Sequence, residues 1–221
     1  MLQIKDSLGT YFTIESTPKR IISLVPSLTE TLYDLGLEDK IVGITKFCVH
    51  PFHLKSTKKI IGGTKKVHYE KIRLLKPDFI IANKEENTEE MVIELRKICP
   101  VWVTDIVTIE NVLQTITDFG KLFNCRTEAQ KWNDKITFSY ADFLNFTKDL
   151  AEKKAAYFIW KNPYMVAGTN TFIDILAEDP EYFPLRKLSV LPVGVASDRA
   201  VVRGLQQMLM YVWLLSLVSE R

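Results

Sequence analysis

The sequence predicts an α/β fold with two Rossmann-like lobes, each built on a parallel sheet, joined by one long backbone helix. Three observations predict it. Strands alternate with helices over residues 21–106, one apolar stripe continues without Gly or Pro through residues 126–153, and a strand pattern resumes at Ala155. We therefore expect a first lobe over 1–107, a helical linker over 108–153 and a truncated or atypical second lobe over 154–221.

Composition and charge narrow the class of protein. The chain has 221 residues, of which 47% are hydrophobic and 25% charged, as in ordinary globular proteins. Lys and Arg number 29 and Asp and Glu 27, so the net charge of +2 gives no basic excess, and we expect no nucleic-acid partner. Three cysteines without a CxxC spacing argue against a disulfide framework and a zinc knuckle.

The first predicted strand and helix meet at a proline. Arg20–Val25 is a short apolar run that ends at Pro26, as a buried strand does. Ser27 is then the expected helix N-cap, and Glu30, three residues later, would complete a capping box. Gly36 is expected to end this helix.

The same alternation continues to residue 106. Further strands are expected at residues 41–45, 59–61, 78–82 and 101–106, and helices at residues 69–75 and 88–98. The polar run from Asn83 to Glu90 is interpreted as a solvated loop and helix start. Short connections favour a parallel sheet, and such sheets place ligands outside the carboxyl ends of their strands.

A helical region follows the first lobe. Residues 109–123 predict one amphipathic helix and residues 126–153 a second, longer one. The apolar stripe of the second helix comprises Trp132, Ile136, Tyr140, Phe143, Phe146 and Leu150. At 1.5 Å per residue this helix would reach about 40 Å, which exceeds what a compact connection needs. We expect it to run between two parts of the molecule.

The last third of the chain loses the alternation. A strand is expected at residues 155–160, a turn at residues 162–163, an extended piece at residues 164–167 and a helix at residues 171–176. Residues 177–221 carry three prolines, a short strand-like piece at residues 189–195 and an apolar helix at residues 205–218. The longest apolar run there, residues 208–218, is shorter than the about 20 residues that span a bilayer, so no transmembrane segment is expected.

Four segments form a recognisable set: Arg20-Ile-Ile-Ser-Leu-Val-Pro-Ser-Leu-Thr-Glu30, Leu74-Leu-Lys-Pro-Asp-Phe-Ile-Ile-Ala82, Pro100-Val-Trp-Val-Thr-Asp-Ile106 and Trp160-Lys-Asn-Pro-Tyr-Met-Val-Ala-Gly168. Together they resemble the helical-backbone (class III) binding proteins of ABC importers, most closely the cobalamin-binding branch. The resemblance covers residues 4–176. It implies a non-enzymatic protein that holds cobalamin, a ferric siderophore or haem between two lobes and delivers it to a permease.

The resemblance also assigns roles by position. Ligand-lining positions fall on Ser27, Thr29, Phe47, Thr64, Asn83, Trp160 and Tyr164. Thr64 stands where cobalamin binders can carry a tryptophan, which weakens a cobalamin assignment. The acid that docks onto the permease falls on Glu70, and no partner acid can be matched in the second lobe.

Two other interpretations remain open. Cys48, His50, His53 and His68 lie close in sequence and could form a metal site in a cytoplasmic metal-binding domain, although surface histidines in a loop are the favoured explanation. The second interpretation is a truncated member of the family that no longer binds a ligand. The resemblance implies a periplasmic or cell-envelope location, whereas the residues after Met1 show no signal peptide, so the cytoplasm is the alternative. No nucleotide-binding or hydrolase motif occurs.

Overall fold

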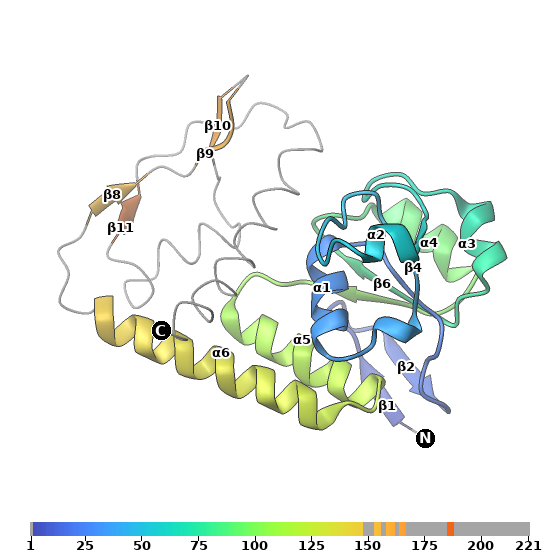
Figure 1. The fold of residues 1–221 in the computed structure, drawn as a ribbon, viewed down its shortest axis with the longest axis horizontal. Helices are drawn as coiled ribbons and strands as arrows, with labels where there is room; N and C mark the ends of the chain where they lie inside the picture. The colour runs from blue at the N-terminus through green and yellow to red at the C-terminus, as the bar shows by residue number, and fades with distance from the viewer. Residues whose placement is uncertain (1, 148–152, 156–157, 162–163, 167–184, 188–221) are drawn as a thin grey trace. The chain divides into compact units, whose positions relative to one another are not determined.

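Figure 1 shows a computed structural model of the chain, which describes residues 2–147, 153–155, 158–161, 164–166 and 185–187. The chain divides into two compact units. The first consists of Met1–Ile106 and Gln114–Lys131, and the second of Val107–Leu113 and Trp132–Arg221. The domain boundaries predicted at residues 107 and 153 stay predictions.

A five-stranded sheet forms the centre of the first unit. Its strands are β3 (Ile21–Ser23), β4 (Ile41–Ile44), β5 (Lys59–Ile60), β6 (Phe79–Asn83) and β7 (Val101–Thr104), in the order β5-β4-β3-β6-β7. Every neighbouring pair is parallel. The α/β class and the parallel sheet predicted from the alternating pattern are therefore confirmed, and the apolar residues of β3, β6 and β7 are buried.

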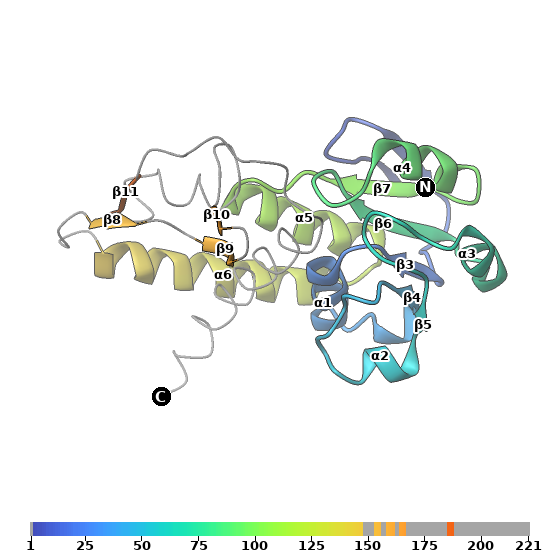
Figure 2. The same ribbon diagram turned by 90° about the horizontal axis from the view of Figure 1, so that it is seen from above.

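Short helices connect these strands (Figure 2). They are α1 (Pro26–Asp34), the 3-10 helix η1 (Glu38–Lys40), α2 (Leu54–Thr57), α3 (Tyr69–Leu75) and α4 (Glu89–Arg96). α1 packs on β3 and β4, α3 on β4, and α4 on β7. Gly36 has a φ of +75° just after α1, as expected of a residue that ends a helix.

The predicted capping of α1 by Ser27 is wrong. The helix begins at Pro26, its N-cap is Val25, two residues before the predicted one, and no side chain caps it. Proline suits the first helical position because its φ is already helical and it has no N–H to satisfy. Ser27 therefore lies inside the first turn, and the capping box with Glu30 does not form.

A hairpin that the sequence analysis missed covers one edge of the sheet. β1 (Leu2–Lys5) and β2 (Tyr11–Ile14) pair in antiparallel fashion. Phe12 of β2 packs against Trp102 and Phe79, with ring centroids 5.3 and 6.1 Å away. At the hairpin turn, Asp6 accepts hydrogen bonds from the backbone N–H groups of Leu8 and Thr10 and, at 3.3 Å, from that of Val103 in β7.

Two longer helices follow the sheet. They are α5 (Ile109–Leu122), which matches the predicted helix closely, and α6 (Arg126–Thr147), which begins where predicted. Asn124, with a φ of 56°, lies in the turn between them. The helices approach so closely there that a Cβ atom on Gly120 would lie 2.6 Å from the Cβ of Ala129.

The long helix is shorter than predicted. α6 has 22 residues, which corresponds to about 33 Å. Its predicted apolar stripe is half-buried at Trp132, Ile136, Tyr140 and Phe143, as expected. The predicted end at Lys153 is wrong, because Lys153 belongs to strand β8. No helix in the described part of the chain is both long and apolar enough to cross a bilayer.

The described part of the second unit contains two strand pairs. β8 (Lys153–Ala155) pairs in parallel with β11 (Leu185–Lys187), and β9 (Phe158–Lys161) pairs antiparallel with β10 (Tyr164–Val166). The strand expected over residues 155–160 is thus represented by β8 and β9. The turn at 162–163, the helix at 171–176, the strand at 189–195 and the helix at 205–218 lie outside the described residues.

Candidate functional site

The strand order creates a switch point in the first unit. From β3 the chain moves outward to β4 and β5 on one side, and then returns to place β6 and β7 on the other. The loops that follow β3 and β6 consequently leave the sheet in opposite directions. In open parallel sheets this divergence, at the carboxyl ends of the strands, is where ligands bind.

The predicted residues Ser27 and Thr29 follow β3, but they lie in different environments. Ser27 is half-buried in the first turn of α1. Thr29 is fully buried, and its hydroxyl donates to the carbonyl oxygen of Val25 at 2.8 Å. The hydroxyl of Thr29 is therefore already engaged inside the fold.

The loop after β4 carries Phe47, the aromatic residue expected to line the ligand. Phe47 is half-buried, and the ammonium group of Lys46 lies 5.1 Å from its ring centroid. A Cβ atom on Gly63 would lie 3.1 Å from the Phe47 ring, so the ring rests on the loop after β5. Such a ring can form part of an apolar wall for a large ligand.

Two hydrogen bonds join the loops after β5 and β6. Asn87 donates from Nδ2 to the carbonyl oxygen of Thr64 at 2.8 Å, and Lys65 donates from Nζ to the carbonyl oxygen of Glu85 at 2.8 Å. β4 and β3 lie between β5 and β6 in the sheet, so these loops meet across the carboxyl ends of both intervening strands. We call this meeting point, formed by residues 64–65 and 85–87, the loop junction.

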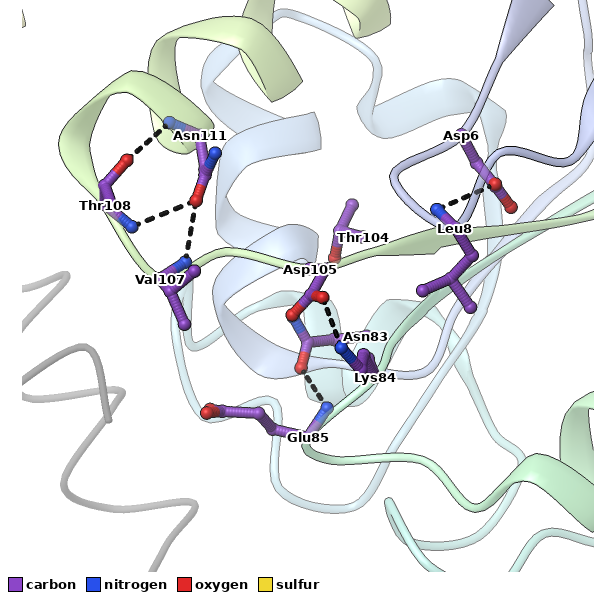
Figure 3. A network of polar contacts seen from close by, with 10 residues as sticks. All are labelled: Asp6, Leu8, Asn83, Lys84, Glu85, Thr104, Asp105, Val107, Thr108 and Asn111. Atoms are coloured by element: carbon purple, nitrogen blue, oxygen red, sulfur yellow. Dashed lines mark hydrogen bonds and ion pairs between the residues drawn. The ribbon is translucent and has the colours of Figure 1, made fainter. Parts of the chain in front are cut away.

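Asn83 organises the loop after β6. Its side chain donates to Thr104 Oγ1 at 3.2 Å and accepts from the backbone N–H of Glu85 at 2.9 Å, and its own N–H donates to Asn87 Oδ1 at 2.9 Å. Figure 3 shows Asn83 with Glu85, beside the ion pair between Lys84 Nζ and Asp105 Oδ2 at 2.5 Å. The sequence placed Asn83 in this loop, whereas the structure makes it the buried last residue of β6, from which its amide holds the loop in shape.

The expectation that residues 83–90 form a solvated loop is wrong in part. Glu86 and Asn87 are buried, with Glu86 only 4% exposed. Burial is the main cause that raises the pKa of Glu86 to about 7, assisted by Glu85 and opposed by Lys65. The pair of asparagines four residues apart, directly after a buried strand, was the available sign of an ordered loop.

Other carboxyl groups near the carboxyl ends also carry raised pKa values. Burial, together with the neighbouring Asp34, raises the pKa of Glu30 to about 7. Burial and then Asp105 raise the pKa of Glu85, whereas Lys84 and Lys65 lower it. At the strand ends, the ionised form of these carboxyl groups is therefore disfavoured relative to the neutral form.

The proposed metal ligands do not assemble. Cys48 is buried beside Thr29 and Thr45, with sulfur–oxygen distances of 3.3 and 3.4 Å, and burial raises the pKa of its thiol. His53 pairs instead with Glu38 at 2.9 Å. No group of three His, Cys, Asp or Glu side chains suited to a metal ion occurs among the residues that the structure describes.

Glu70 lies on the surface of the first unit. It is in the first turn of α3, its side chain is 81% exposed, and it forms an ion pair with Arg73. Trp160 and Tyr164 lie on β9 and β10 of the second unit, where Trp160 is paired with Met165 and Tyr164 with Lys161. The roles of these three residues, and of the ligand-lining set in the first unit, stay predictions.

Comparison with known proteins places the chain in a family. The periplasmic binding protein family matches residues 21–179, and the chain belongs to it. This family consists of binding components of transport systems, not enzymes.

Individual relatives and structures agree with the family assignment. An uncharacterised ABC transporter substrate-binding lipoprotein of Bacillus subtilis is 28% identical over 179 residues, 77% of this chain and 56% of the relative. A cobalamin-binding protein of Halobacterium salinarum is 27% identical over 78% of this chain and 47% of the relative. The chain thus spans about half the length of these curated relatives. A solved siderophore-binding protein, bound to ferric iron and two acinetobactin molecules, shares the fold, with a TM-score of 0.74 and 21% identity over 88% of this chain and 71% of that one.

Proposed function

We propose that the chain acts as the substrate-binding component of an ABC importer and captures a metal chelate, namely a corrinoid, a ferric siderophore or haem. The family match over residues 21–179 carries this proposal, because it includes every loop at the carboxyl ends of the sheet. The relatives from Bacillus and Halobacterium support it by their described roles.

Metal chelates of this kind are large and largely apolar at their edges. A site for them needs aromatic walls and a few polar anchors rather than catalytic groups. Phe47, at the switch-point edge of the sheet, supplies a half-buried ring. Trp160 and Tyr164 are further aromatic residues that we propose to line the ligand. Thr29 and Asn83 offer no free hydroxyl or amide group, because their side chains are already hydrogen-bonded inside the fold. Ser27 and Thr64 complete the proposed ligand-lining set of the first unit.

A fluorescence titration tests the function. The chain has four tryptophans, so their emission is followed while cobalamin, cobinamide, haemin and ferric hydroxamates are added. We expect at least one ligand to quench with a Kd below about 10 µM, equivalent to about −7 kcal/mol. Absence of any binding in this range would refute capture of a metal chelate and favour a family member that no longer binds.

A matched pair of variants tests whether Phe47 forms part of the ligand-binding site. Phe47→Ala is expected to raise the Kd of the ligand about tenfold, because it removes a ring at the strand ends. Phe138→Ala removes the same atoms from an exposed ring on α6, which is 71% exposed, and should leave the Kd unchanged. Equal effects of the two substitutions would remove Phe47 from the site.

We also propose that Glu70 contacts the permease in the cell envelope. Its exposed carboxylate on α3 can pair with a basic side chain of a partner. Glu70→Lys should lower stimulation of the importer's ATPase at least fivefold while leaving ligand affinity intact. The same reversal at Glu89, an exposed acid of α4, serves as the control.

A further inference from the structure

One oxygen of a buried carboxyl group at the loop junction has no hydrogen-bond partner in the described part of the chain. The Oε2 atom of Glu86 is buried and makes no hydrogen bond among the described residues. An acceptor left in this state costs free energy, and it costs more when it is charged. Native proteins satisfy nearly all buried polar side chains, so this oxygen marks a place where a polar group from outside the chain can bind.

The surroundings of Glu86 place it at the strand ends. Its neighbours Glu85 and Asn87 hold the loop after β6 against Lys65 and Thr64 of the loop after β5. The Lys65 ammonium is the one cation that lowers the pKa of Glu86, and its hydrogen bond is directed to the Glu85 carbonyl instead. Glu85 is the acid that raises this pKa further.

We propose that Glu86 is a specificity-determining residue that anchors the ligand and selects chelates with amide groups at their rim over chelates with carboxylates. This inference rests on the proposed function and names the ligand chemistry of the same site. The side-chain oxygen without a partner provides the anchor, and the two hydrogen bonds of the loop junction fix its backbone at the carboxyl ends of the strands.

The selection follows from hydrogen-bond chemistry. A primary amide carries both a donor and an acceptor, so it can pair with Glu86 whether that group is ionised or neutral. A ligand carboxylate accepts only. It can pair with neutral Glu86 and is repelled by the ionised form. Because Glu86 titrates near neutral pH, the penalty on carboxylate ligands should grow as pH rises through about 7.

Two corrinoids with the same ring test the proposal. Dicyanocobinamide carries amides at its rim, and dicyanocobyrinic acid carries carboxylates at the same positions. The measured quantity is the ratio of their dissociation constants, acid over amide, at pH 6 and pH 8. In the wild type we expect the ratio to rise at least fivefold between these pH values. In Glu86→Gln, which remains neutral, the ratio should be at least tenfold smaller than in the wild type at pH 8 and independent of pH.

Glu90→Gln is the control, because Glu90 is exposed on α4 four residues away. It should reproduce the wild-type ratios. Equal ratios in the wild type and Glu86→Gln, with cobinamide still bound, would overturn the role of Glu86 and leave the proposed function standing. Binding of haemin or a siderophore without either corrinoid would do the same. Failure of every chelate to bind would instead remove the proposed function, and this inference with it.

Discussion

The side-chain amide of Asn87 donates to the carbonyl oxygen of Thr64 at 2.8 Å, although their loops follow strands that are three positions apart in the sheet. The same side chain accepts from the backbone N–H of Asn83 through Oδ1. One asparagine thus satisfies a carbonyl in the loop after β5 and an N–H at the end of β6. Asn87 therefore ties these two parts of the strand ends together.

Replacing Asn87 by alanine should therefore destabilise the protein. Both of its backbone partners would lose a buried hydrogen bond, which costs about 2–4 kcal/mol in total. Urea unfolding followed by circular dichroism measures the change. Thr137→Ala, at an exposed position of α6, should stay within about 0.5 kcal/mol of the wild type. A similar small effect for Asn87→Ala would show that the loops are held in another way.

Glu86 should make stability depend on pH. Its pKa in the folded protein is raised to about 7 from 4.5, so the folded state retains a proton that the unfolded state releases. The contribution of Glu86 to the free energy of unfolding is therefore most favourable below about pH 4.5, and it is lost as the pH rises towards 7. Glu86→Gln removes the ionisation and should stabilise the protein by about 2–3 kcal/mol at pH 8.

The measurement for Glu86 is urea unfolding at pH 4.5 and pH 8. The gain from Glu86→Gln should disappear at pH 4.5, where the wild-type carboxyl is already neutral in the folded state. Glu90→Gln, at an exposed acid, should show no such difference between the two pH values. A gain of the same size at both pH values would contradict ionisation as the cause.

The cysteines should resist thiol reagents while the protein is folded. Burial raises the pKa of the Cys48 and Cys125 thiols, and it raises the pKa of Cys99 to about 12. Since the thiolate is the reactive form, modification by DTNB at pH 8 should be at least a hundredfold slower than in 6 M guanidinium, where all three react. Fast labelling of Cys48 in the folded protein would show that the loop after β4 opens readily.

The close contact between α5 and α6 should not tolerate a side chain at Gly120, in the last turn of α5. Alanine there would place its Cβ 2.6 Å from the Cβ of Ala129, so one helix must shift, at a cost of about 1–3 kcal/mol. In an Ala129→Gly background, Gly120→Ala should cost clearly less, because the opposing methyl group is gone. A double-mutant cycle by thermal or urea unfolding measures this coupling. Additive effects would mean that the helices do not meet at this point.

The sequence predicted the parallel sheet well because its strands are short, continuous apolar runs bounded by proline and glycine. It failed at two helix ends. Pro26 displaced the capping serine because a proline at the first helical position needs no cap, and Lys153 proved to be in a strand. A capping pattern is therefore weak evidence for where a helix begins when a proline next to it suits the first helical position better.

The candidate site was harder to predict than the fold. Phe47 could be located by counting from a strand end, since its place depends on sequence-local structure. The burial of Glu86 could not, because it arises from contact between two loops about 20 residues apart in the chain. A run of acidic and amide residues looks solvated until the loop that covers it is known.

The turn of the β1–β2 hairpin also has a consequence for handling the protein at high concentration. Asp6 and Ser7 both make hydrogen bonds to Val103 of β7, the outermost strand on that side. An outer strand with unsatisfied backbone groups can recruit a strand from a neighbouring molecule, which begins aggregation. The turn of the hairpin therefore occupies backbone groups of this outer strand. We expect a variant without the β1–β2 hairpin to aggregate more readily at high concentration.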